Sequence, residues 1–93
     1  MPPRSASARD VLGYWVRLKR VEKGWSQERL AHECELDRTY VSSVERSQWN
    51  VSLASIERLA SALGVEPWML LVSPSITASE AGKLLSRKQH ESS

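Results

Sequence analysis

Residues 26–52 have the sequence SQERLAHECELDRTYVSSVERSQWNVS. This sequence predicts two short helices joined by a tight turn. Ser26 is suited to cap the first helix, because its hydroxyl can accept a backbone N–H two or three residues later. Asp37 holds the same position before a second helix. In that helix Val41 and Val44 lie three apart on one face, which predicts that this face is buried and that the opposite face is polar.

The outward face of the second helix is short and rich in hydrogen-bond donors. It carries Arg38, Thr39, Ser42, Ser43 and Arg46. An arginine can bind guanine O6 and N7 through its forked donors, and serine or threonine hydroxyls can bond several base edges. We therefore predict that the first four of these residues read bases in the major groove of double-stranded DNA. For Arg38 the alternatives are a phosphate contact or a surface salt bridge to Asp37 or Glu35.

Glu45 would repel DNA if it lay on that outward face. We therefore expect Glu45 to lie on the core side of the helix, where a carboxylate needs a cationic partner. We predict that Arg20 is this partner and that the ion pair orients the second helix.

The runs SQERLA, LDRTYVSSVER and NVSLASIERLASALGV resemble the Cro and lambda-repressor type of helix-turn-helix transcriptional regulators, the xenobiotic-response-element family, over roughly residues 10–72. The run RTYVSxxER followed by NxSL is most similar to restriction–modification controller proteins, which are small dimeric regulators that bind operator repeats upstream of their own genes. The family commonly places glycine or a similar residue between the helices, whereas this chain has Cys34-Glu35. A non-glycine residue in the left-handed region costs about 1 kcal/mol or more.

Seven further residues are predicted to contact the DNA backbone around the reading face. They are Gln27, Tyr40, Arg46, Trp49, Asn50, Ser52 and Arg17. The resemblance implies the role of Gln27, and the positive end of the helix dipole gives a physical reason for it. Tyr40 can alternatively pack its ring against the preceding helix. Arg46 and Arg17 can alternatively be solvated cations on the surface.

The chain divides into an expected flexible arm at residues 1–7, a helix-turn-helix domain at 8–72 and a tail at 73–93. We expect an all-α, compact five-helix domain. Its first helix ends at Gly24, its fourth runs from the Ser52 cap to Gly64, and its fifth spans about 67–72. The apolar face of the fourth helix comprises Leu53, Ile56, Leu59, Ala60 and Leu63. Thr77-x-x-Glu80 has capping-box spacing, which predicts an additional C-terminal helix to about Lys88.

One helix-turn-helix makes few contacts with DNA, and specific binding usually needs two half-sites on a two-fold symmetric dimer. The predicted homodimer surface is Trp68, Met69, Leu70 and Leu71, which supply more apolar area than so short a helix can bury. In the tail, Leu84 and Leu85 can either extend that interface or cover the core.

Composition narrows the possible partners. Hydrophobic residues make up 41% of the 93 residues, which is ordinary for one globular domain, and the formal net charge is only +2. The single cysteine, Cys34, excludes an internal disulfide, and no Cys/His cluster has the spacing of a metal site. We expect no cofactor, metal, small-molecule ligand or membrane contact. Without a signal-peptide core or a span of about 20 apolar residues, the expected location is the bacterial cytoplasm, at the nucleoid through operator binding.

The function predicted from these features is sequence-specific transcriptional regulation by a dimer that controls its own operon. Two alternatives remain: an antitoxin-type regulator that also binds a toxin protein, and a phage or plasmid repressor. An enzyme is not expected, because His32 and His90 stand far apart and no paired carboxylates or phosphate-binding glycine loop is present.

Overall fold

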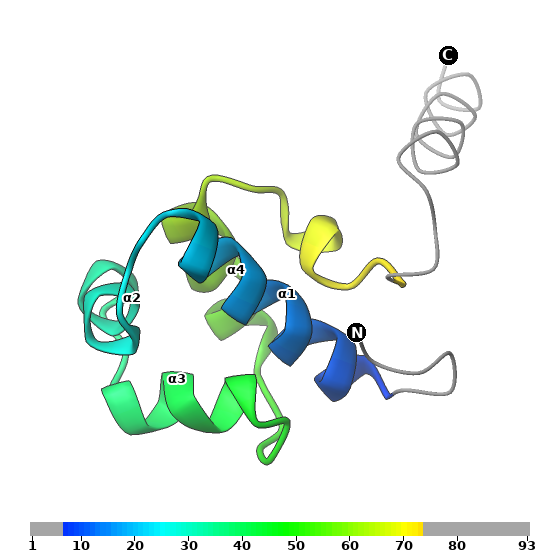
Figure 1. The fold of residues 1–93 in the computed structure, drawn as a ribbon. Helices are drawn as coiled ribbons and strands as arrows, with labels where there is room; N and C mark the ends of the chain where they lie inside the picture. The colour runs from blue at the N-terminus through cyan, green and yellow to red at the C-terminus, as the bar shows by residue number, and fades with distance from the viewer. Residues whose placement is uncertain (1–6, 74–93) are drawn as a thin grey trace.

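The computed structural model describes residues 7–73 and arranges them as four α-helices followed by one turn of 3-10 helix (Figure 1). The elements are α1 (Ala8–Glu22), α2 (Gln27–Cys34), α3 (Arg38–Glu45), α4 (Leu53–Leu63) and η1 (Pro67–Leu70). The predicted all-α fold is confirmed, but the fifth helix is only the four-residue η1 and does not reach Val72. The arm up to residue 6 and the predicted tail helix lie outside the described residues.

Side-chain caps begin all four α-helices. Ser7 forms a capping box with Asp10 at the start of α1. At the start of the next three helices, Ser26 accepts from the Arg29 N–H at 3.0 Å, Asp37 from the Thr39 N–H at 2.8 Å, and Ser52 from the Ser55 N–H at 3.1 Å. Each cap satisfies a backbone donor that the helix leaves unpaired and contributes roughly 1 kcal/mol. The caps expected at residues 26, 37 and 52 are therefore all present.

The core draws fully buried side chains from all five elements. They are Val16, Leu30, Val41, Val44, Leu59 and Leu70. Burying an aliphatic side chain of this size contributes about 1.5–3 kcal/mol. Because α1 and α2 both pack against α3, and α4 packs against α1, α2 and η1, the same cluster holds the two short helices in a fixed relation.

Leu53 differs in burial from what helical spacing suggests. Leu53, placed on the buried face of α4 by its period, is 75% exposed because it is the first residue of the helix and nothing packs over that end among residues 7–73. Trp25 packs partly against the core, and the charged groups of Lys23 and Arg29 are 4.9 and 5.0 Å from its ring centre. Among residues 7–73, no helix is long and apolar enough to cross a membrane.

Candidate nucleic-acid interface

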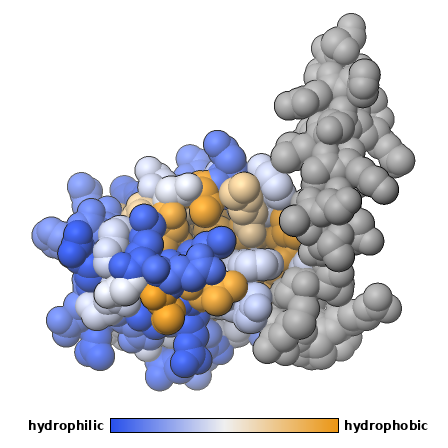
Figure 2. Space-filling model, turned by 45° about the horizontal axis from the view of Figure 1, so that its top comes forward, coloured by the Kyte–Doolittle hydropathy of each residue, from blue (hydrophilic) through white to orange (hydrophobic). Residues whose placement is uncertain are grey.

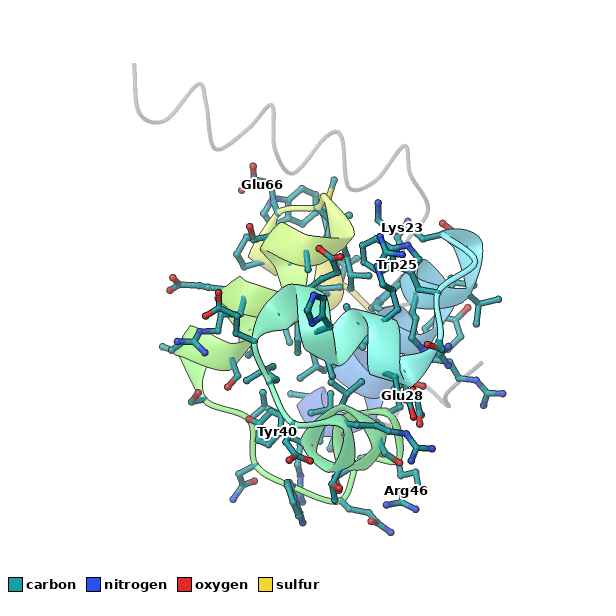
Figure 3. The ribbon with its side chains drawn as sticks, turned by 90° about the vertical axis from the view of Figure 1, so that its left-hand side faces the viewer. Lys23, Trp25, Glu28, Tyr40, Arg46 and Glu66 are labelled. Atoms are coloured by element: carbon teal, nitrogen blue, oxygen red, sulfur yellow. The ribbon has the colours of Figure 1, made fainter. Side chains whose placement is uncertain are left out.

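The second helix of the pair, α3, lies along one edge of the molecule (Figure 1). Its inner side packs against α1 and α2, so the opposite side of an eight-residue helix is left facing outward. Figure 3 shows Tyr40 and Arg46 on α3 at the lower end of the molecule, on the other side of α2 from Lys23 and Trp25. The arrangement presents one face of α3 to whatever approaches that edge.

The outward face of α3 carries most of the residues predicted to read bases. Arg38 and Thr39 are exposed and Ser42 is half-buried. The Arg38 side chain is 64% exposed, and its nearest carboxylate is that of Glu28, with 3.9 Å between Arg38 Nε and Glu28 Oε1. An exposed ion pair this long contributes little. The alternative partners, Asp37 and Glu35, form no ion pair with Arg38, so its guanidinium is available to another acceptor.

The structure excludes Ser43 from the residues predicted to read bases. Its exposure is only 2%, so it cannot reach a base edge from its place in α3. Both α1 and α2 pack against α3. The buried side of α3 is therefore wider than the stripe of Val41 and Val44 and also includes Ser43. The reading face that remains is Arg38, Thr39 and Ser42.

Arg20, Glu45 and Gln27 form one network beneath that face. Arg20 donates to both Glu45 oxygens, from Nε to Oε2 at 2.7 Å and from Nη2 to Oε1 at 3.0 Å, and also from Nη1 to the Trp25 carbonyl oxygen at 2.7 Å. The Arg20 and Glu45 side chains are only 13% and 4% exposed. Gln27 Nε2 adds a hydrogen bond to Glu45 Oε1 at 3.2 Å. The predicted ion pair thus links α1 to α3, and the amide of Gln27 joins α2 to both.

Gln27 is the first residue of α2 and is half-buried. A glutamine amide has two N–H donors and a carbonyl acceptor, and the bond to Glu45 engages one donor. The other donor remains available, so a backbone contact by Gln27 is compatible with the network, and the network would fix the direction in which the amide points.

Tyr40 and Trp49 form an aromatic pair at the edge of the α3 surface. Their ring centres are 5.7 Å apart with planes inclined by 58°. The Tyr40 ring is half-buried against the core cluster, whereas Trp49, in the link after α3, is exposed. The Tyr40 ring therefore packs inward, which is one of the two alternatives for this residue, and it is also flanked by the Trp49 indole.

The other residues predicted to contact the DNA backbone differ in exposure and in the hydrogen bonds that they already form. Arg46, Asn50 and Arg17 are exposed. The Ser52 hydroxyl is already engaged, because it caps α4 and also donates to Ser55 Oγ at 3.0 Å. A phosphate contact by Ser52 would therefore use its main-chain N–H in preference to its side chain.

The turn between α2 and α3 places Glu35 in the left-handed region, with φ 57° and ψ 40°. The glutamate thus adopts the conformation for which the family commonly uses glycine. The Leu36 N–H donates to the Ala31 carbonyl oxygen at 2.9 Å and the Glu35 N–H to the His32 carbonyl oxygen at 3.2 Å, which closes α2. The strained residue is stabilised by these end-capping bonds.

A second surface, formed by α4 and η1, is apolar. Leu70, predicted to lie in a dimer interface, is instead fully buried, because the tight turn of η1 folds its side chain inward under α4. Trp68, Met69 and Leu71 are exposed as expected, and Leu53 joins them. A hollow of about 640 Å³ lies here. Its walls are mostly apolar, with Glu57, Ser61 and Glu66 as the polar residues among Leu53, Ile56, Ala60, Val65, Pro67, Trp68 and Leu71.

Sequence reasoning missed Leu53 as part of this surface because it assigned all five apolar residues of α4 to one face. The exposure of Leu53 could have been predicted from its position directly after the Ser52 cap, because no preceding helical turn covers a side chain there. Figure 2 shows the molecule with the top of Figure 1 turned forward; on this face, apolar residues group near the middle and hydrophilic residues lie around them.

The described residues include one cysteine and no cluster of possible metal ligands. Cys34 is buried, and burial raises the pKa of its thiol to about 11, so it is protonated at neutral pH. Within residues 7–73 no group of three or more His, Cys, Asp or Glu side chains could hold a metal ion.

Comparison with known proteins shows that most of the described residues match a known protein family. Residues 16–67 match the helix-turn-helix family model. A hypothetical transcription factor of Neisseria meningitidis serogroup B is 57% identical over 72 residues, which cover 77% of this chain and 68% of that protein. The control protein C.BamHI of Bacillus amyloliquefaciens is 52% identical over 62 residues, which cover 66% of this chain and 76% of that protein.

Two solved structures share the fold. The crystal structure of the hypothetical transcription factor NHTF from Neisseria has a TM-score of 0.72 at 50% identity and covers 90% of this chain and 95% of that chain. The restriction–modification controller protein C.Esp1396I, crystallised as a tetramer in complex with its natural 35 base-pair operator, has a TM-score of 0.64 at 32% identity. The match covers 71% of this chain and 87% of that chain.

Proposed function

Because the chain belongs to the helix-turn-helix family of DNA-binding transcription regulators and is similar to restriction–modification controller proteins, we propose that it binds operator DNA as a homodimer and controls its own operon. The observation that carries the proposal is the exposed donor face of α3, with Arg38, Thr39 and Ser42 turned outward and the ion pair of Arg20 with Glu45 fixing the helix behind them. These residues are proposed to read bases.

The proposed backbone contacts surround that face. Gln27 at the start of α2 bonds Glu45, which directly precedes Arg46 at the end of α3. The other proposed backbone contacts are Tyr40, Trp49, Asn50, Ser52 and Arg17. Contacts of this kind fix the position of a protein on the duplex without reading sequence. They are proposed to set the register in which the three reading residues meet the bases.

Dimer formation is proposed through Trp68, Met69, Leu71 and Leu53 at the α4–η1 surface. Leu53, Trp68 and Leu71 are exposed and line a hollow, and Met69, next to Trp68 in the chain, is also exposed. Monomers seldom leave such an apolar patch open. A two-fold axis would bring the same patch of a second copy against it, since an isologous interface is self-complementary. The dimer would then present two copies of α3 to two half-sites about one helical turn apart.

The test is footprinting of the purified chain on the DNA directly upstream of its own gene. We expect protection of two inverted half-sites whose centres are about one helical turn, or a multiple of it, apart. The same DNA fused to a reporter gene should change its expression when the protein is supplied. Absence of protection on that DNA, with binding to a specific site elsewhere, would exclude control of its own operon but not DNA reading.

A further inference from the structure

The backbones of α1 and α3 approach each other closely at Gly13, which is buried in α1. A Cβ built on Gly13 would lie 2.7 Å from the Val44 carbonyl oxygen and 3.1 Å from the Glu45 carbonyl oxygen. Ordinary Cβ contacts begin at 3.4 Å, so the shorter distance would be about 0.7 Å too small. The obstructing atoms belong to the main chain of α3, which cannot turn aside as a side chain can. Any side chain at this position therefore requires α1 and α3 to move apart.

Ser47 joins the same end of α3 to the start of α1. Its hydroxyl donates to the Arg9 carbonyl oxygen at 3.2 Å, and a Cβ at Gly13 would also lie 3.1 Å from this hydroxyl. Ser47 has a φ of 60°, in the left-handed region that serine rarely occupies. A strained conformation persists only where the surrounding structure stabilises it, and the bond to Arg9 is part of that structure.

Arg20 completes the attachment two turns further along α1, where it binds Glu45 through two hydrogen bonds. Residues 9, 13 and 20 lie on one side of α1, and all three contact the last residues of α3 or the turn after it. The C-terminal end of α3 is thus held at three points along α1. The arrangement determines both the distance and the tilt of α3 relative to the rest of the domain.

We propose that Gly13 is a positioning residue for DNA recognition, because its lack of a side chain sets how far the reading face of α3 projects from the domain. The inference rests on the proposed function. The helix has eight residues and a length of roughly 12 Å, so a displacement at Val44 also moves Arg38, Thr39 and Ser42. A binding site must be held to within about 0.5 Å, and restoring an ordinary contact of 3.4 Å at Gly13 would take a shift of about 0.7 Å.

The effect of this shift on cognate DNA should exceed its effect on other sequences. Base-edge hydrogen bonds need precise placement, whereas exposed side chains such as Arg46 and Arg17 can follow a phosphate through several rotatable bonds. A methyl group at Gly13 should therefore reduce discrimination between sequences more than it reduces overall affinity for DNA.

The experiment compares Gly13→Ala with the wild-type chain on two duplexes. Selection from a random DNA library with the wild-type protein supplies the cognate duplex, and a scrambled version of it supplies the other. With both Kd values measured at one salt concentration, we expect the ratio of scrambled to cognate Kd to fall at least tenfold for Gly13→Ala. The Kd for the scrambled duplex should change less than threefold, and circular dichroism should confirm the helical fold.

Two further variants make the result specific. Ser47→Ala removes the bond to Arg9 without introducing a clash, so it should lower the ratio about threefold, and it decides the matter if Gly13→Ala does not fold. Leu63→Ala is the matched control for lost stability, because it truncates a buried side chain in α4, which packs chiefly against α1, α2 and η1. It should lower Tm and leave the ratio unchanged.

The inference is overturned if folded Gly13→Ala, or Ser47→Ala in its place, keeps the wild-type ratio to within twofold. It is also overturned if Leu63→Ala lowers the ratio as much, since the effect would then follow from stability alone. In both cases the proposed function stands. If the wild-type chain enriches no sequence from the library, the proposed function fails, and this inference fails with it.

Discussion

Arg38 is exposed, and its 3.9 Å ion pair with Glu28 is too long to hold the guanidinium in place. Arg38→Ala should weaken binding to the cognate duplex by roughly 1–3 kcal/mol and relax the preference at one base position. Titration of cognate and random duplexes by fluorescence anisotropy would measure both effects. Equal loss on the two duplexes would show that Arg38 contacts a phosphate.

The matched variant for Arg38 is Gln27→Ala, since Gln27 is proposed to contact the backbone. It should weaken both duplexes alike, because a phosphate contact carries no sequence information. Its bond to Glu45 also makes it a sensitive control: a loss confined to the cognate duplex would mean that Gln27 acts by orienting α3.

Glu45 and Arg20 show how strongly burial changes the value of an ion pair. Glu45→Ala should lower the free energy of unfolding by about 3–5 kcal/mol, because it leaves a nearly buried guanidinium without its carboxylate. Glu33→Ala is the matched control, since Glu33 pairs with Arg29 at a similar 2.9 Å but both side chains are well exposed. It should cost less than about 1 kcal/mol. Urea denaturation would decide the matter, and equal costs would contradict the structural role assigned to Glu45.

At the scale of the elements, the turn between α2 and α3 contains avoidable strain at Glu35. Glu35→Gly should raise the free energy of unfolding by up to about 1 kcal/mol, because glycine occupies the left-handed region freely. For a domain of this size, 1 kcal/mol shifts Tm by roughly 4–8 °C. The control Glu57→Gly, in the interior of α4, should instead cost about 1 kcal/mol. If both substitutions destabilise the domain, the Glu35 side chain itself contributes to stability.

Local sequence was sufficient to predict where α2, α3 and α4 begin and where α1 and α4 end. Ser26, Asp37 and Ser52 cap helices because their side chains reach the nearest free N–H groups, and Gly24 and Gly64 adopt positive φ at helix ends. These interactions span only a few residues. The length of the fifth helix was wrong, since η1 is a single tight turn whose shape depends on how Leu70 enters the core.

For the whole molecule, the proposed dimer depends on the α4–η1 surface. Leu71→Glu should convert the dimer to a monomer, because it would bury a charge in an apolar interface, and should thereby reduce binding to a complete operator far more than to one half-site. Val21→Glu is the matched control: Val21 on α1 is 56% exposed against 43% for Leu71, but it does not line the hollow. Sedimentation velocity would measure the assembly. A dimer that survives Leu71→Glu and dissociates with Val21→Glu would move the interface to α1.

The amino-acid sequence by itself determined the α-helices, their caps and their apolar stripes, because these depend on residues close together in the chain. It also determined that Glu45 pairs with a basic residue, because a buried carboxylate needs a positive charge beside it. Only the tertiary structure decided which side chains remain on the surface. Ser43 is buried because two helices press on α3, Leu53 is exposed because nothing described covers the first turn of α4, and Leu70 enters the core through η1. The period of a helix gives the direction of a side chain, but burial depends on what another segment places there. Close packing at Gly13 is of the same kind, since it exists only where α1 and α3 meet.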